Sequence, residues 1–460
     1  MRKIMVFLML VLCLFHCCPL TAGATGDGSI TNGCSTLRAR HALGEDQDYT
    51  GTAKAAVLYE LNTKTLVFAH DPDKAINPTG LVKLMTALIV LEEGNLDDVV
   101  TVKQSTLNAL SGGAKKLGLK ANDQLSVRDL LYCVMVVSAN DAAAVVADHV
   151  AGSQSAFVNK MNEKAATLGC TSTHFSDVNG LNDNDQSSTA REMAIIVEEA
   201  LKNEQFVELF GAVNYQLPTT VSCENRMLTT THSPMNPNSK QYDQRITGGK
   251  PSAASGSDRS VISVAQTEKG RYLCVLISVS DKKSDYSGTF KEAKMLFDMG
   301  LNGYAVQQVL GSGQPFGMYE VSNGENSVVV TPDREVYALL PVEFDHTLLK
   351  FQDVKNLQSL TAPVKKGAVV GTLQVSYSSI IVAEADLLAC HDVAEKGTTI
   401  QPVAVTSGSG GLMRILKWIC IVVVCLVAVA AVGILTLRQI NKARYQKRKG
   451  RRRHPEQEGV

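Results

Sequence analysis

Residues 77–86 read Asn-Pro-Thr-Gly-Leu-Val-Lys-Leu-Met-Thr, and this stretch decides the fold of the chain. It opens an apolar-periodic segment that runs from residue 81 to residue 93 and stops at Gly94. The pattern predicts a helix with Thr79 or a neighbour as its N-cap and Gly94 as its C-terminal stop. Because helix positions i and i+3 share a face, Gly80 and Lys83 are expected to lie one turn apart on the same side.

Two later stretches complete a pattern with this helix. Ser138-Ala139-Asn140 stands between the apolar segments 126–137 and 141–150, which predict two helices. Gly248-Gly249-Lys250-Pro251-Ser252 precedes alternating runs at residues 261–266 and 271–279, which predict strands. Helices gathered between these strands and an early strand pair at residues 53–69 indicate an α+β fold.

The order, spacing and flanks of the three stretches resemble the D-alanyl-D-alanine carboxypeptidases. These low-molecular-weight penicillin-binding proteins carry Ser-x-x-Lys, then Ser-x-Asn, then Lys-Thr-Gly. The resemblance covers residues 52–394 and includes the blocks 157–162, 173–175, 179–181 and 188–193. It implies a β-lactamase-like domain, an antiparallel sheet flanked by helices. The site would lie between a helix start, the Ser-x-Asn loop and an edge strand.

The resemblance also assigns roles to residues, and one of them is missing. Gly80 stands where the family carries its serine nucleophile, so the chain offers no hydroxyl there to attack a carbonyl. Lys83 would take the proton of that hydroxyl. Ser138 would help to relay the proton, and Asn140 would hold the substrate backbone. The backbone N–H of Gly80 could still serve as half of an oxyanion hole.

The third motif departs from the family pattern at two of its three positions. Lys250 is retained, but Pro251 and Ser252 replace the threonine and the glycine. The family threonine offers a hydroxyl to the substrate carboxylate, and proline has none. Proline is tolerated in a strand only where the edge is open, which predicts an edge strand along a cleft. Ser252 adds bulk where the substrate would lie.

Each of these residues also has a purely structural interpretation. Thr79 is the nearest hydroxyl to position 80 and could replace the nucleophile, but a helix N-cap is its ordinary role. Asn140 or Asp141 would cap the following helix without any substrate. Gly249-Lys250 alone would be an ordinary turn into a strand. The match of whole flanking blocks favours the family site.

Both ends of the chain predict contact with a membrane. Basic residues before an apolar run, and Ala22-Gly23-Ala24 after it, predict a secretory signal peptide over residues 1–24. Residues 414–437 are long and apolar enough to cross a bilayer, and residues 438–460 form a basic tail. Such a tail is retained on the cytoplasmic side, which places the body of the protein outside the cell membrane. A nucleic-acid patch is the weaker interpretation, because the basic residues begin directly after the span.

The remaining domain boundaries follow from changes in composition along the chain. Residues 25–51 are expected to be a flexible lead, 52–305 the carboxypeptidase-like domain, 306–395 a small all-β domain and 396–413 a linker. The 460-residue chain has balanced formal charge and no metal-ligand spacing, so no metal or cofactor is expected. Cys133 and Cys274 lie in apolar runs and are expected to be buried, and a disulfide among the other extracytoplasmic cysteines stays open.

Two functions are consistent with this pattern. The first is a membrane-anchored carboxypeptidase homologue that binds peptidoglycan stem peptide, or a cell-wall protein, with little or no cleavage. The second is a working serine-type carboxypeptidase that removes a terminal D-alanine with a substitute nucleophile. Loss of one member of a cooperating catalytic set can cost on the order of a millionfold in kcat, which favours the first.

Overall fold

The structure, a computed structural model, describes residues 42–43, 49–110, 115–181, 185–220, 224–253, 258–283, 285–354 and 360–397. The expected signal peptide, membrane span and basic tail, with Cys34 and Cys223, lie outside these residues. Within the described part, none of the helices combines the length and hydropathy that a bilayer crossing requires. The chain divides into two compact units, Met1–Glu395 and Lys396–Val460, and the account below concerns the first.

A five-stranded antiparallel sheet forms the centre of the first domain, with strand order β2-β1-β9-β8-β7. The early strand pair expected from the sequence lies at one end, beside the late strands, and β7 forms the other edge. The strands are β1 (Ala55–Glu60), β2 (Thr65–His70), β7 (Ile246–Ala253), β8 (Asp258–Thr267) and β9 (Gly270–Ser280).

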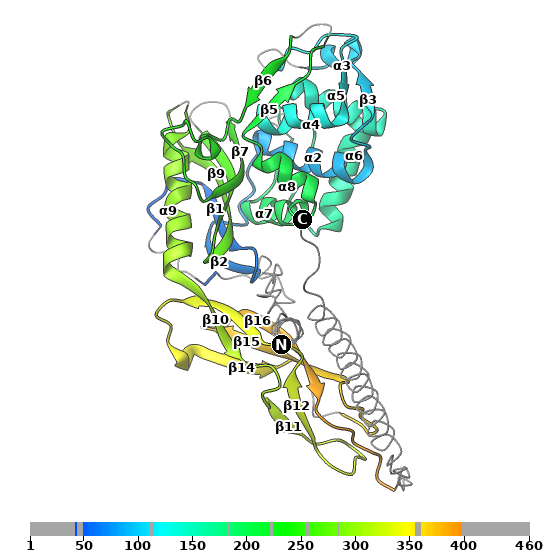
Figure 1. The fold of residues 1–460 in the computed structure, drawn as a ribbon, viewed down its shortest axis with the longest axis vertical. Coiled ribbons are helices and arrows are strands. Elements are labelled where there is room, and N and C mark those ends of the chain that lie inside the picture. Colours follow the sequence, from blue (N-terminus) through cyan, green and yellow to red (C-terminus); the bar gives the residue numbers. More distant parts are fainter. Residues whose placement is uncertain are drawn as a thin grey trace, which may run out of the picture. The chain divides into compact units, whose positions relative to one another are not determined.

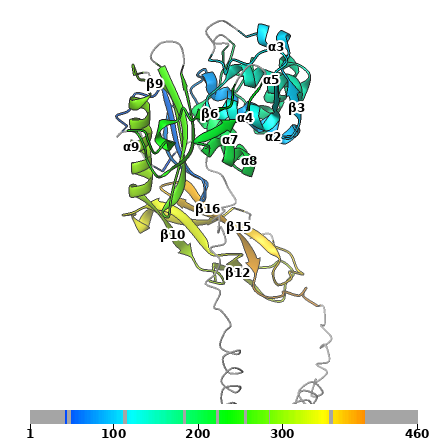
Figure 2. The ribbon, with the colours of Figure 1, turned by 45° about the horizontal axis from the view of Figure 1, so that its top comes forward.

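The two faces of this sheet carry alternating side chains, as a strand buried on both sides requires. On one face Val57, Leu273 and Val275 join the core formed with the helices α2 to α8. On the other face Leu58 and Cys274 join a core with α9 (Ser287–Gly303). The sheet therefore lies between α9 and the remaining helices, as Figures 1 and 2 show.

The helical region positions the predicted site, and α2 lies at its centre. Every side chain from Val82 to Val90 is buried, so this helix is enclosed on all sides, and Lys83 and Thr86 are its buried polar side chains. The helices are α2 (Val82–Glu93), α3 (Gln104–Asn108), α4 (Val127–Val136), α5 (Asn140–Ala151), α6 (Gln154–Thr167), α7 (Ala190–Ala200) and α8 (Glu204–Gly211).

Four of the helices, α4, α6, α7 and α8, begin after a residue whose side chain caps them. Ser126 and Asp129 form a reciprocal capping box at the start of α4. The helix α7 begins after Thr189, whose side chain caps it, and ends at Ala200. Asn203 then starts α8, its side-chain oxygen accepting hydrogen bonds from the backbone N–H groups of Gln205 and Phe206.

Gly94 ends α2 as predicted, in an extended rather than a left-handed conformation. Its N–H donates to the carbonyl of Val90, and a Cβ at this position would lie 2.7 Å from that carbonyl oxygen. The helix therefore ends at a glycine because a Cβ would clash with the preceding turn, and not because this residue has a positive φ.

Short strands between the helices form two antiparallel pairs that the sequence did not reveal. They are β3 (Val99–Thr101) with β4 (Gln124–Ser126), and β5 (Asn214–Leu217) with β6 (Arg226–Thr229). Short 3-10 turns also occur, at η3 (Thr79–Leu81), η4 (Ser233–Met235) and η5 (His346–Leu348).

The C-terminal domain is all-β, as predicted, and begins directly after α9. A five-stranded sheet of order β11-β12-β16-β15-β14 accompanies the pair β10 and β13. Its core consists of alternate side chains such as Val328, Val330, Leu373 and Val375. The strands are β10 (Tyr304–Leu310), β11 (Gly317–Tyr319), β12 (Val328–Pro332), β13 (Val336–Pro341), β14 (Leu349–Asp353), β15 (Val369–Tyr377) and β16 (Ile380–Ala389).

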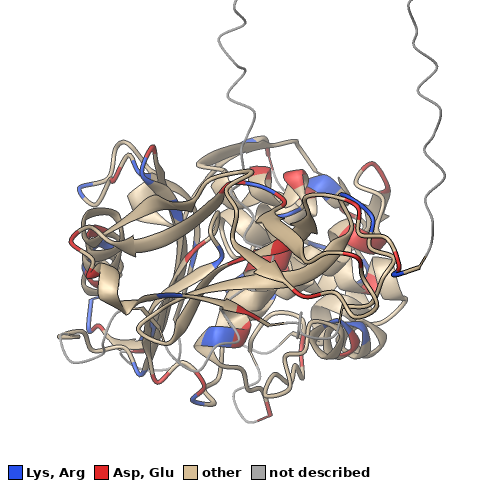
Figure 3. Cartoon of the chain, turned by 90° about the horizontal axis from the view of Figure 1, so that it is seen from below, with Lys and Arg blue, Asp and Glu red and all other residues tan. Residues whose placement is uncertain are grey.

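Charged and reactive side chains are distributed without an extended bias. The sequence has 45 Lys and Arg against 45 Asp and Glu, and the two signs are interspersed over the elements visible in Figure 3. Among the described cysteines, Cys133, Cys170 and Cys274 are buried thiols and Cys390 is partly exposed; none of these four is in a disulfide.

Candidate active site

Position 80 is the centre of the candidate site, and two side chains converge on it. A Cβ built on Gly80 would lie 2.8 Å from Ser252 Oγ and 3.4 Å from Lys83 Nζ. Lys83 reaches this point from one turn along α2, and Ser252 reaches it from the edge strand β7. The space beside the Gly80 backbone is therefore bounded by an amine on one wall and a hydroxyl on the other.

Thr79 adopts an unusual backbone conformation beside this space. Its φ is +53°, which is uncommon for a residue with a branched side chain. Its hydroxyl forms a hydrogen bond with Ser252 Oγ at 2.6 Å, and α2 has no side-chain cap. The predicted N-cap role of Thr79 is wrong because its hydroxyl is taken by the strand across the cleft.

A tight loop from a different part of the chain supports the Thr79 backbone. Gly180 has φ +79°, and a Cβ there would lie 2.0 Å from the carbonyl oxygen of Thr79. Asp177 holds this loop, because its carboxylate accepts hydrogen bonds from the backbone N–H groups of Asn179, Gly180 and Leu181. The sequence block around Asn179 and Gly180 thus fixes the start of the central helix.

Lys83 is almost completely buried and carries a perturbed amine. Its Nζ donates a hydrogen bond to the carbonyl oxygen of Asn179 at 2.5 Å. Burial lowers the pKa of the amine to about 7, with Lys115 adding to the depression and Asp177 opposing it. At neutral pH a substantial fraction of this lysine is uncharged, as a general base requires.

The turn between α4 and α5 places Ser138 and Asn140. Ser138 has φ +60°, and Asn140 is the first residue of α5, with its N–H donating to the carbonyl oxygen of Lys115. The Asp141 carboxylate accepts from the backbone N–H groups of residues 117–119. The capping interpretation of Asn140 is therefore wrong. Its buried Oδ1 has no hydrogen-bond partner within the described residues.

Lys250 connects the edge strand to this turn. The side chain is fully buried, and its Nζ donates to the carbonyl oxygens of Val134 at 2.8 Å and Met135 at 3.3 Å, at the end of α4. Burial lowers its pKa well below the usual range, and the charges of Lys83 and Lys115 lower it further. The two lysines of the predicted site therefore lie close enough to affect each other.

Pro251 and Ser252 lie on β7, which pairs only with β8 and forms the edge of the sheet. Pro251 is opposite Val261, and its missing N–H is tolerated at this open edge. Ser252 is buried and directed at position 80 and Thr79. Its Oγ lies 2.8 Å from the point where a Cβ of residue 80 would be.

His232 supports the edge strand and had no sequence signal. Its ring is fully buried, and a Cβ at Gly249 would lie 2.3 Å from His232 Nε2. Ser263 forms a hydrogen bond with the same nitrogen at 2.9 Å. Burial, with the charge of Lys250, lowers the pKa of His232 to about 3, so the ring is neutral. A lone histidine followed by an ordinary loop could not have been assigned this position from sequence.

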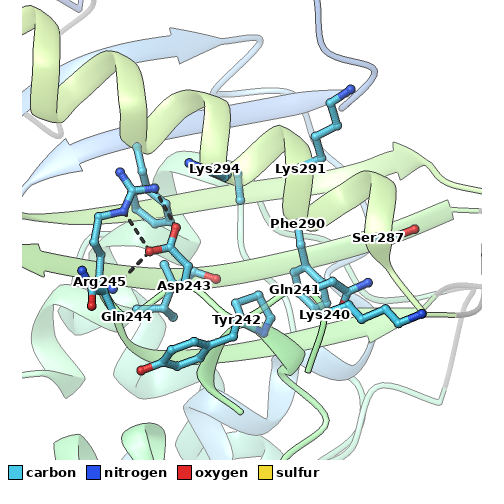
Figure 4. Close-up of a pocket in the computed structure, with 15 residues that line it drawn as sticks. Lys240, Gln241, Tyr242, Asp243, Gln244, Arg245, Ser287, Phe290, Lys291 and Lys294 are labelled. Atoms are coloured by element: carbon cyan, nitrogen blue, oxygen red, sulfur yellow. Dashed lines mark hydrogen bonds and ion pairs between the residues drawn. The ribbon is translucent and has the colours of Figure 1, made fainter. Parts of the chain in front are cut away.

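A separate hollow of about 580 Å³ lies between α9 and residues 240–246, shown in Figure 4. Arg245 forms ion pairs there with Asp243 and Asp298, and Phe290 and Phe297 line the apolar side. None of the seven predicted site residues lines this hollow. It therefore does not belong to the predicted active site.

Comparison with known proteins gives consistent matches across both domains. Residues 42–281 match the D-alanyl-D-alanine carboxypeptidase family model, and residues 304–395 match the C-terminal domain of penicillin-binding protein 5. The carboxypeptidase DacA of Haemophilus influenzae is 29% identical over 358 residues, covering 75% of this chain and 86% of the relative. Escherichia coli DacC is 27% identical over 357 residues, covering 75% and 85%.

Solved structures agree with these sequence matches. Penicillin-binding protein 5 of Haemophilus influenzae superposes with a TM-score of 0.62 at 26% identity, covering 76% of this chain and all of that chain. Penicillin-binding protein 6B of Escherichia coli, at 22% identity and a TM-score of 0.57, supports the fold; the match covers 75% of this chain and 98% of that chain.

Proposed function

Because this chain belongs to the D-alanyl-D-alanine carboxypeptidase family of peptidoglycan metabolism, we propose that it binds stem peptides at the family cleft without cleaving them. The family acts on the D-Ala-D-Ala end of the stem peptide. In this proposal Gly80 occupies the nucleophile position, with Lys83, Ser138, Asn140 and Lys250 as the remainder of the site.

One observation carries the proposal: the space beside Gly80 is bounded by Lys83 and by Ser252, and residue 80 brings no hydroxyl of its own. Loss of one member of such a set can cost on the order of a millionfold in kcat, or about 8 kcal/mol of barrier. The remaining hydrogen-bond donors support binding but leave no group to form the acyl-enzyme.

The test is exposure of the full-length protein, purified in detergent, to a fluorescent penicillin. We expect no covalent adduct, and no D-alanine release from a synthetic pentapeptide, under conditions in which Haemophilus influenzae DacA is labelled. A stable adduct located by mass spectrometry on any residue of the cleft would contradict the proposal.

A second candidate function, cleavage with a substitute nucleophile, is favoured by the hydroxyl pair of Thr79 and Ser252. These oxygens lie 2.6 Å apart beside the perturbed amine of Lys83. The same experiment decides between the two functions, because an adduct would map to Thr79 or Ser252. Either Thr79→Val or Ser252→Ala would then abolish adduct formation, according to which of the two hydroxyls carries the adduct.

The cellular location is a further part of the proposal and rests on the sequence. Residues 1–24 would direct export, residues 414–437 would anchor the protein as a single-pass helix, and the basic tail would stay inside. Protease added to intact protoplasts should degrade the ectodomain and leave a short membrane-protected C-terminal fragment. Protection of the ectodomain would reverse this topology.

A further inference from the structure

The groups around position 80 are all suited to one kind of ligand atom. Lys83 Nζ and Ser252 Oγ lie 3.4 Å and 2.8 Å from the point where a Cβ of residue 80 would be. Ser252 shares a hydrogen bond with Thr79 at 2.6 Å, so one hydroxyl of the pair donates within the pair and the other can donate outward. No ligand atom fits at that point, which is a bond length from the Gly80 Cα and already in contact with Ser252. An anionic oxygen acceptor that lies over the partly exposed Gly80 would instead meet the amine and the hydroxyl together.

Among the described residues no carboxylate forms a salt bridge with these amines, although Asp177 lies near enough to Lys83 to raise its pKa. Within the described ranges, Lys83 donates to the carbonyl of Asn179 and Lys250 donates to the carbonyls of Val134 and Met135, and neither forms a salt bridge. Two buried amines near each other repel when both are charged, so an anion placed between the walls would relieve that repulsion.

Two buried side-chain oxygens offer acceptors for a peptide backbone. The buried Oδ1 of Asn140 has no partner among the described residues, and the same holds for Oδ1 of Asn179. An unpaired buried acceptor costs free energy until a donor reaches it. The backbone N–H of a bound peptide can supply that hydrogen bond. The cleft can then bind both a backbone amide and the C-terminal carboxylate of a peptide.

We propose that the cleft binds a peptide's C-terminal carboxylate in the space beside Gly80, held by Lys83 and Ser252. It therefore recognises stem peptides that have already lost their terminal D-alanine. This inference rests on the proposed non-cleaving function. A peptide one residue longer would bring an uncharged amide to the same position and would need room for another residue, at the strand wall where Ser252 now lies.

Pro251 supports the same choice of ligand. It has neither a side-chain hydroxyl nor a backbone N–H, so it cannot donate to the carboxylate of a longer peptide. The hydrogen-bond donors Lys83 and Ser252 lie instead at position 80. They would therefore meet the ligand residue that precedes the terminal residue of the longer peptide. The class of reaction that supplies this ligand is hydrolysis of a D-Ala-D-Ala bond by an active carboxypeptidase.

Binding should depend on pH through the protonation of Lys83. The charged groups that affect its amine are Asp177 and Lys115, and Lys250 is coupled to it. In the free protein the pKa of Lys83 is about 7, and a bound carboxylate raises it. Binding therefore takes up protons near pH 7, and the affinity falls as the pH rises above 7.

The test uses calorimetry on the full-length protein in detergent with three synthetic probes. They are diacetyl-L-lysyl-D-alanine, its C-terminal amide, and diacetyl-L-lysyl-D-alanyl-D-alanine. We expect the free acid to bind at least tenfold more tightly than the other two probes. Lys83→Met should remove that preference by weakening the free acid alone, and Ser252→Ala should reduce it severalfold.

Lys294→Met is the matched control, because Lys294 is an exposed lysine on α9 whose partner is Asp298. It should leave all three affinities unchanged. If Lys83→Met fails to fold, as judged by circular dichroism, Ser252→Ala and the amide probe still decide the question. Equal binding of the acid, amide and longer peptide would overturn this inference and leave the proposed function intact. Failure of every probe to bind would overturn both, and cleavage of the longer peptide would overturn the non-cleaving function.

Discussion

The two walls of the cleft differ in how far they keep the family pattern. The helix wall carries Lys83 and, beside it, the turn with Ser138 and Asn140, all as the motifs require. The strand wall keeps Lys250 but has Pro251 and Ser252 in place of threonine and glycine. In our interpretation Gly80 and Ser252 are departures from the motif on the two walls, and Ser252 Oγ lies 2.8 Å from the point where a Cβ of residue 80 would be.

This difference shows that the two changes act on the same space. A hydroxyl is still present in the cleft, but it is attached to the edge strand and hydrogen-bonded to Thr79. A serine at position 80 would lie in the 3-10 turn η3 that leads into α2, three residues before Lys83. The segment that carries the hydroxyl therefore matters for catalysis, because the orientation of a nucleophile alone can change the reaction rate by several orders of magnitude.

The largest effect is expected from moving the hydroxyl back to the helix wall. Gly80→Ser alone should give little penicillin acylation, because its Cβ would lie 2.8 Å from Ser252 Oγ and displace that side chain from Thr79. The triple change Gly80→Ser, Pro251→Thr, Ser252→Gly should give far more than the single changes combined. The gain could approach about a millionfold, since these groups act as a unit.

Acylation rates with a fluorescent penicillin, measured for all single, double and triple variants, test this coupling. Ser252→Gly alone is the control and should remain inactive. Full activity from Gly80→Ser alone would show that the strand wall does not matter, and that our interpretation of Pro251 and Ser252 is wrong.

An intermediate effect is expected at the loop that supports the helix wall. Gly180→Ala should lower the free energy of unfolding by roughly 2–5 kcal/mol, from left-handed backbone strain plus overpacking against Thr79. The new Cβ would lie 2.0 Å from the Thr79 carbonyl oxygen. Urea denaturation of the full-length protein measures the change.

Gly152→Ala is a matched control for that experiment. Gly152 has the same φ of +79° at the end of α5, but a Cβ there would meet nothing within 4 Å. It should show only the backbone term, about 1–2 kcal/mol. Equal losses for the two variants would show that Gly180 has no special role in holding Thr79.

Much of this architecture followed from the sequence because its signals were local. The apolar run after Gly80, the apolar segment over residues 126–137 and the alternating strands predicted the main elements within a few residues. The family blocks then predicted which stretches meet. The short strand pairs were not predicted, because strands of three or four partly exposed residues carry no clear period.

The details of the site depended on long-range contacts that no local pattern encodes. Thr79 was expected to cap its own helix, but a strand 173 residues away supplies the partner of its hydroxyl. Likewise, Asp141 binds the loop at residues 117–119 in place of capping α5. The role of His232 beneath Gly249 depends on the approach of two distant segments, and a single histidine gives no sign of it.

The smallest expected effect is the contribution of Lys83, on the helix wall, to the pH dependence of stability. In the unfolded chain a lysine has a pKa of about 10.4, whereas burial lowers that of Lys83 to about 7 in the folded protein. Between these values the unfolded chain binds more protons than the folded protein. Stability therefore rises with pH in this window, by at most about 1.4 kcal/mol per pH unit for one group.

Lys83→Met removes this contribution, so the comparison with the wild type isolates it. Between pH 7 and 9 the free energy of unfolding should increase with pH more steeply for the wild type than for Lys83→Met, by about 1 kcal/mol per pH unit. Titrating groups that do not interact with Lys83, such as the buried thiol of Cys274, cancel in the difference, whereas Lys250 is coupled to Lys83 and contributes to it. Lys294→Met, at an exposed lysine, should stay parallel to the wild type. Parallel curves for Lys83→Met as well would mean that Lys83 keeps an ordinary pKa. The helix wall would then present a fixed positive charge at neutral pH, and binding of a carboxylate there would lose its dependence on pH near 7.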